Sequence, residues 1–201
     1  MPGNATPRRV FVLSPANLSG PRAQLLMRSN TRSELAQRLR AEGAPLGEVF
    51  SFISGLYFRG KLAYARAFSD AATPLGNSVL VITSTSGLIP PDRVTSPQHL
   101  RRMATVPIHV SSKRYIKALE QDALQLAAQL DGDTEVVLLG SVATPKYIAP
   151  LSRILGTRLV IPRAFVGLGD MARGALLLRA VRERTPLDYI TFASTRASAS
   201  K

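Results

Sequence analysis

Short apolar runs alternate with longer amphipathic segments along most of the chain. Four runs rich in Val, Ile, Leu and Phe have the length of β-strands, at residues 9–14, 78–83, 135–139 and 158–162. A loop follows each run, and segments with apolar residues at helical spacing lie between the runs. This alternation predicts an α/β protein, and we expect a three-layer α/β/α domain with a mainly parallel central sheet.

Helix-start signals stand in front of most of the amphipathic segments. Thr31 and Glu34 have the spacing of a capping box, and Ser96 is followed by a proline at the first helical position. Thr144 repeats this cap-then-proline signature, and Asp170 is expected to cap the last long helix with its own carboxylate. We therefore expect helices that begin near residues 32, 97, 113, 145 and 171.

The segment 46–68 is apolar and aromatic and contains two internal glycines. Because an interior glycine costs a helix about 1 kcal/mol, we expect two shorter helices with a break near Gly55. Tyr57, Arg59 and Lys61 alternate aromatic and cationic side chains, a pattern that could stack bases and hold phosphates of a nucleic acid. The pattern is equally compatible with a core helix whose aromatic residues are packed, and the sequence leaves both interpretations open.

The chain is long enough for one domain with a substantial core, which we assign to residues 1–192. An edge strand is expected at 187–192, and the small and polar residues 193–201 are expected to form a disordered tail. The first residues lack the apolar region of a secretory signal, and no apolar run reaches membrane-spanning length. We therefore expect a cytoplasmic protein that does not associate with a membrane.

The formal charge of +13, from 26 Lys and Arg against 13 Asp and Glu, points to a class of partner. Arginine supplies 21 of the basic residues, and its planar guanidinium group matches phosphate oxygens well. We therefore expect a nucleic acid or a phosphorylated small molecule as partner. Preferential arginine usage in a GC-rich genome is the alternative explanation. The absence of cysteine excludes disulfides, zinc–thiolate sites and thiol catalysis.

Three loops that follow predicted strands carry hydroxyls, glycines and cations. In an open α/β sheet such loops meet at the carboxyl edge of the strands, where ligands bind. One loop places a lysine in the first turn of a helix, where the helix dipole disfavours a cation unless an anion lies beside it. Another has two glycines at a helix start and resembles a phosphate-binding loop, although it lacks the further residues of a nucleotide-binding motif. The expected ligand-binding residues are Ser84, Ser86, Gly87, Gly140, Ser141, Thr144, Lys146, Gly167, Gly169 and Arg173.

Residue combinations typical of catalytic sites are scarce. His99 and His109 have no carboxylate at metal-ligand spacing, and there is neither a nucleophile elbow nor a carboxylate pair on one helix face near a loop. We expect no bound metal and no cofactor. If the protein is an enzyme, Asp170 and Asp92 are the preferred acid–base residues, because they lie just beyond strand ends.

Four motifs within residues 9–184 occur in an order that is similar to a known family: LYFRGKLAYARAF, VLVITSTSGLIPPD, VVLLGSVATPKY and VGLGDMARGALL. The order resembles that of an uncharacterised bacterial domain family related to YaaA-type peroxide-stress proteins and to a domain of archaeosine-pathway enzymes. The resemblance implies association with nucleic acid or a modified base. It marks Leu56, Tyr57, Phe58, Ser84, Gly87, Pro90, Gly140, Gly167 and Gly169. The chain departs from the family at Pro15, where the family has cysteine, and near Thr95, where it has tyrosine.

The sequence therefore predicts a protein that binds a nucleotide, a nucleobase or a nucleic-acid strand at the carboxyl edge of its sheet. One alternative is an enzyme that acts on an N-glycosidic bond or a modified base. Another is a non-catalytic protein that docks a partner through the aromatic stretch Phe50 to Phe68. An exposed aromatic face on that stretch would favour docking, and a buried one would count against it.

Overall fold

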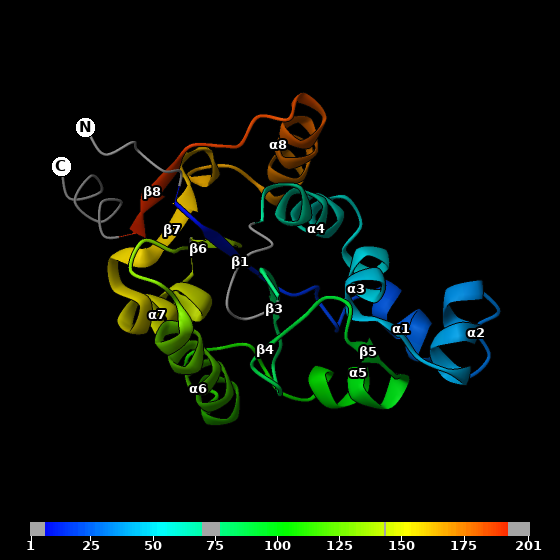
Figure 1. The fold of residues 1–201 in the computed structure, drawn as a ribbon. Helices are drawn as coiled ribbons and strands as arrows, with labels where there is room; N and C mark the ends of the chain where they lie inside the picture. The colour runs from blue at the N-terminus through cyan, green and yellow to red at the C-terminus, as the bar shows by residue number, and fades with distance from the viewer. Residues whose placement is uncertain (1–6, 70–76, 143, 193–201) are drawn as a thin grey trace, which may run out of the picture.

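The central sheet has six strands in the order β4-β3-β1-β6-β7-β8 (Figure 1). The computed structural model describes residues 7–69, 77–142 and 144–192. The parallel strands are β1 (Arg9–Leu13), β3 (Val79–Ile82), β6 (Glu135–Leu139) and β7 (Leu159–Pro162). The antiparallel strands β4 (Leu88–Ile89) and β8 (Tyr189–Thr191) form the two edges. The four predicted strands and the predicted edge strand are confirmed. The predicted tail at 193–201 lies outside the described residues.

Helices cover both faces of the sheet and confirm the three-layer α/β/α architecture. Phe11 and Leu13 point to one apolar core, whereas Val10 and Val12 point to the other, because successive side chains of a strand alternate between faces. The first face carries α3 (Leu46–Ser54), α4 (Leu56–Phe68) and α8 (Asp170–Glu183), and the second carries α6 (Lys113–Gln129) and α7 (Pro145–Leu155) (Figure 1). The first core is extended by α1 (Pro21–Met27), α2 (Glu34–Ala41), α5 (Pro97–Ala104) and the ribbon of β2 (Ala44–Pro45) and β5 (Val94–Thr95).

Helices α4 and α8 lie side by side and touch backbone to backbone at two glycines (Figure 1). A Cβ atom on Gly60 would lie 2.8 Å from the carbonyl oxygen of Gly174, and a Cβ atom on Gly174 would lie 3.0 Å from Cα of Tyr57. Gly60 and Gly174 therefore permit the close packing of the two helices. The contact sets the N-terminal half of α4 against the first turns of α8.

The predicted break in segment 46–68 is confirmed at Gly55, whose φ of 60° and ψ of −129° interrupt the helix. Ser96 caps α5 as predicted by accepting from a backbone amide. Thr144 occupies the N-cap position of α7 as predicted, but its side chain makes no capping bond. Two other cap predictions are wrong. Ser33 caps α2 in place of Thr31, because the Thr31 hydroxyl donates to the carbonyl of Leu25. Asp170 is the first helical residue of α8, and its carboxylate makes no capping bond.

The topology creates a crevice between the carboxyl ends of β1 and β6. After β1 the chain passes to helices on the first face, whereas after β6 it passes to α7 on the second face. Loops that leave adjacent parallel strands in opposite directions separate, and ligands of open α/β sheets bind at such a switch point. Within the described residues, no helix is long and apolar enough to cross a membrane.

Candidate functional site

A cleft of about 460 Å³ opens at this switch point. One wall is the loop at residues 14–19, directly after β1, and the facing wall is formed by Ser141 after β6 and the first turn of α7. Thr83 and Ser84 contribute from the end of β3, and apolar residues of the segment 103–108 close one side. Loops that are far apart in the sequence therefore meet around one space, as expected from the fold class.

Lys61 lies beneath the cleft and is 1% exposed. Its Nζ donates to the carbonyl oxygen of Ser14 at 2.5 Å and to Ser14 Oγ at 2.8 Å, and it lies 4.5 Å from the ring centroid of Tyr57. Burial lowers the pKa of Lys61 to about 7, an effect that the Asp170 carboxylate opposes and the Arg173 guanidinium reinforces. An amine that can gain or lose a proton near neutral pH therefore holds Ser14, which itself lines the cleft.

Tyr57 lines the cleft, and no described group makes a well-aligned hydrogen bond with its hydroxyl, although the Arg173 guanidinium lies close to it. The residue is 6% exposed, and burial raises its pKa to about 12, although nearby Arg173 opposes this shift. A buried hydroxyl left without a partner costs about 1–3 kcal/mol. Burial also raises the pKa of Tyr147, which lies across the cleft, with a further increase from Tyr57 and Asp170. Both phenols are therefore neutral hydrogen-bonding groups at physiological pH.

Asp170 and Arg173 occupy the start of α8 with opposite exposure. The Asp170 side chain is 67% exposed and borders the cleft, whereas the Arg173 side chain is 6% exposed. Arg173 donates to the carbonyl oxygen of Phe165 through Nη2 at 2.9 Å and through Nε at 3.3 Å, and its Nη1 lies 3.4 Å from Asp170 Oδ1. Arg173 therefore fixes the segment in front of α8 and orients the carboxylate, while Asp170 is free to meet a ligand.

The structure gathers five of the residues predicted from the sequence around the cleft: Tyr57, Ser84, Ser141, Lys146 and Asp170. Of these, Ser84 is already engaged, because its hydroxyl donates to the carbonyl of Met103. Lys146 Nζ lies 5.1 Å from the ring centroid of Tyr147. A hydroxyl, a cation and a carboxylate from separate elements thus face the same space.

Several other predicted residues have packing roles or lie elsewhere. Gly140 packs against Ser14, where a Cβ atom would lie 3.0 Å from the serine Cβ. Gly87 has a φ of 58° and packs on α6, where a Cβ atom would lie 2.6 Å from a backbone oxygen. Asp92 forms an exposed ion pair with Arg66 at 2.5 Å and does not line the cleft. The remaining residues that do not line it are Ser86, Thr144, Gly167, Gly169, Arg173 and Arg59.

The sequence predicts Tyr57 and Lys61 as nucleic-acid contacts, whereas in the structure both side chains are buried between α4, α8 and β1 and form no exposed stacking face. Arg59 alone of the three is exposed. Sequence reasoning missed Ser14 and Tyr147. The signal for Ser14 was its position directly after the first strand. Tyr147 directly follows the predicted site residue Lys146 in the first turn of α7.

Among the described residues, no group of three or more His, Asp or Glu side chains is placed to hold a metal ion. The resemblance to the YaaA-related family stays a prediction. Comparison with protein-family models, curated proteins and solved structures yields no match to this chain. The function is therefore argued from the chemistry of the cleft.

Proposed function

We propose that the protein binds a nucleoside, a nucleotide or a base of a nucleic acid in the cleft at the ends of β1, β3 and β6. The observation that carries the proposal is the convergence, at a topological switch point, of loops from three strands and the start of α8. A volume of about 460 Å³ is within the range of small-molecule sites.

The groups around the cleft match the parts of a nucleotide. Tyr57 offers an unused hydroxyl, and Asp170 offers a carboxylate that can accept from the N–H groups of a base or the hydroxyls of a sugar. Lys146 lies in the first turn of α7, where both its charge and the positive end of the helix dipole favour an anion. A phosphate there would remove the unfavourable interaction between the lysine and the dipole.

Calorimetric titration with nucleobases, nucleosides and nucleoside monophosphates tests this proposal. Tyr57→Phe removes only the unused hydroxyl, so we expect about two- to tenfold weaker binding without loss of stability. Asp170→Asn is expected to weaken binding as well. Asp133→Asn is the matched control for Asp170→Asn, because Asp133 is exposed and lies outside the cleft. The proposal fails if no compound of the panel binds, or if Tyr57→Phe and Asp170→Asn bind like the control.

An enzyme that acts on an N-glycosidic bond or a modified base is the second candidate. It is favoured by the position of Asp170, whose exposed carboxylate borders the cleft while the titratable Lys61 lies beneath it. In that case Asp170→Asn abolishes turnover and leaves binding largely intact, whereas Asp92→Asn has no effect.

The third possibility, docking through the aromatic stretch, loses its main argument. Phe50, Phe58 and Tyr64 are fully buried and belong to the first core. Burial of this face was the outcome expected to count against docking.

A further inference from the structure

A second cavity, of about 380 Å³, lies between the loop after β3, strand β5 and helices α5 and α6. Its lining includes Arg93, Arg102 and Arg114 together with His99, and no carboxylate is among the described residues that line it. Within the described residues, neither an ion pair nor a hydrogen bond engages these three guanidinium groups. Some other arginines of the protein are paired, as Arg153 is with Glu120. Three exposed guanidinium groups thus line one cavity and have no acidic partner in the part of the chain that the structure describes.

A buried hydroxyl in the same cavity also has no partner. Thr95 is 4% exposed and lines the cavity, and its Oγ1 makes no hydrogen bond with any described residue. The hydroxyls of Thr85 and Ser86, 3.3 Å from each other, also line it. A polar atom that is removed from water is almost always hydrogen-bonded in a folded protein, so this exception points to a group that binds there.

We propose that this cavity, which we call the arginine cavity, binds a phosphate group. Phosphate oxygens accept paired N–H donors from guanidinium forks and single donors from hydroxyls, and both kinds of donor line the cavity. Because no described lining residue carries a carboxylate, no acidic side chain competes with a bound phosphate for the guanidinium donors. The phosphate belongs either to a nucleic-acid backbone or to a small phosphorylated molecule.

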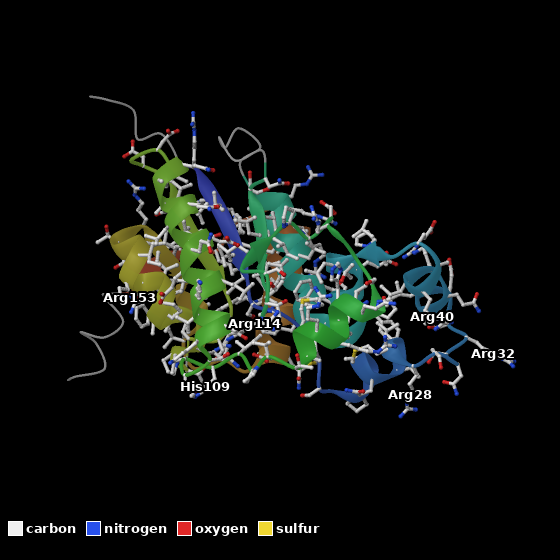
Figure 2. All side chains as sticks on the ribbon, turned by 90° about the horizontal axis from the view of Figure 1, so that it is seen from below. Arg28, Arg32, Arg40, His109, Arg114 and Arg153 are labelled. Atoms are coloured by element: carbon white, nitrogen blue, oxygen red, sulfur yellow. The ribbon has the colours of Figure 1, made fainter. Side chains whose placement is uncertain are left out.

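The arginine cavity is separate from the cleft at the switch point, although Met103 lines both. Ser86, which was predicted to share a site with Ser141, lies in the arginine cavity instead. The role proposed for the arginine cavity does not depend on what the cleft binds. Figure 2 shows Arg114 beside α6, whereas Arg28 and Arg32 lie toward the end of the molecule formed by α1 and α2.

Two double variants with equal loss of charge test the proposal. Arg102→Ala/Arg114→Ala removes two guanidinium groups from the arginine cavity, and Arg28→Ala/Arg32→Ala removes two exposed ones outside it. Fluorescence anisotropy measures binding of a labelled single-stranded oligonucleotide over a range of salt concentrations, with inorganic pyrophosphate as competitor. All variants are checked for folding by circular dichroism. Thr95→Val is a third variant that keeps the size of the side chain and removes the unpartnered hydroxyl.

We expect the cavity double variant to bind at least about tenfold more weakly, with a salt slope shallower by about 1.4, because each lost phosphate contact on a single strand contributes about 0.7. Thr95→Val is expected to lose about two- to tenfold in affinity. If the cavity double variant loses pyrophosphate binding but keeps oligonucleotide binding, the phosphate group belongs to a small phosphorylated molecule. Equal losses in both double variants would overturn the proposal in favour of diffuse surface charge, as would a cavity variant that binds both probes like the unaltered protein.

Discussion

Replacement of Gly174 by alanine tests the backbone contact between α4 and α8. The added Cβ atom would lie 3.0 Å from Cα and 3.1 Å from the backbone nitrogen of Tyr57. Neither of these atoms can move by a side-chain rotation, so the helices themselves must separate. The same substitution at Gly60 would bring a Cβ atom to 2.8 Å from a carbonyl oxygen of α8.

Two effects of opposite sign decide the magnitude. Alanine is favoured over glycine in a helix interior by about 1 kcal/mol, which stabilises the variant. Forcing extra volume into a packed contact typically costs about 1–3 kcal/mol, and a contact with backbone lies at the upper end. We therefore expect Gly174→Ala to lower the free energy of unfolding by about 1–2 kcal/mol, despite its better helix propensity.

Urea denaturation measures this change. Ala175→Gly is the control, because Ala175 is exposed on the same helix and reports the propensity difference alone, at about 1 kcal/mol of destabilisation. If Gly174→Ala is as stable as the unaltered protein or more so, the two helices are not in backbone contact. In that case the account of how Tyr57 and Asp170 are brought together is wrong.

Three further predictions concern single side chains. Lys61 has a pKa of about 7 in the folded protein against an ordinary 10.5, so between these values only the unfolded chain holds the proton. The free energy of unfolding should therefore rise with pH from 7 to about 9.5, by at most ~1.4 kcal/mol per pH unit. Urea denaturation at each pH measures this rise, and Lys61→Met should lack it. Ser96→Ala removes the cap of α5 and should cost about 1 kcal/mol in thermal unfolding; no loss would exclude the cap. The Tyr64 hydroxyl bonds that of Tyr189 at 2.5 Å and accepts from the Leu187 amide at 2.8 Å. Tyr64→Phe should therefore lower the free energy of unfolding in urea by about 1–3 kcal/mol, and an unchanged value would contradict these bonds.

The fold class follows from the sequence because the strands are uninterrupted apolar runs, which few other structures accommodate. The break at Gly55 was equally accessible, since a glycine in an aromatic helix has a known energetic cost. Strand order was not accessible. The placement of β1 between β3 and β6 depends on pairings between distant segments, for which local pattern carries no information.

The candidate site was predicted in outline and misjudged in two places. Ser86 and Ser141 both follow strands, yet the turn at Gly87 directs Ser86 into the arginine cavity. Lys61 looked like a surface cation, because the alternation of aromatic and basic residues on one helix does not reveal which face is covered. Gly60 and Gly174 together indicate which face of the helix is covered. Two glycines inside helices permit a close crossing, and such a crossing buries the residues beside it.

The pairing of α4 with α8 has a consequence for the newly made chain. Tyr64 of α4 also bonds Tyr189 of the last strand, and the two residues are 125 positions apart. During synthesis from the amino terminus, α4 with Lys61 is made long before α8 supplies Asp170 to the border of the cleft. Until α8 arrives, the lysine has no Asp170 nearby and the glycine face of α4 is uncovered. The part of the cleft wall that Asp170 forms therefore exists only once α8 has docked.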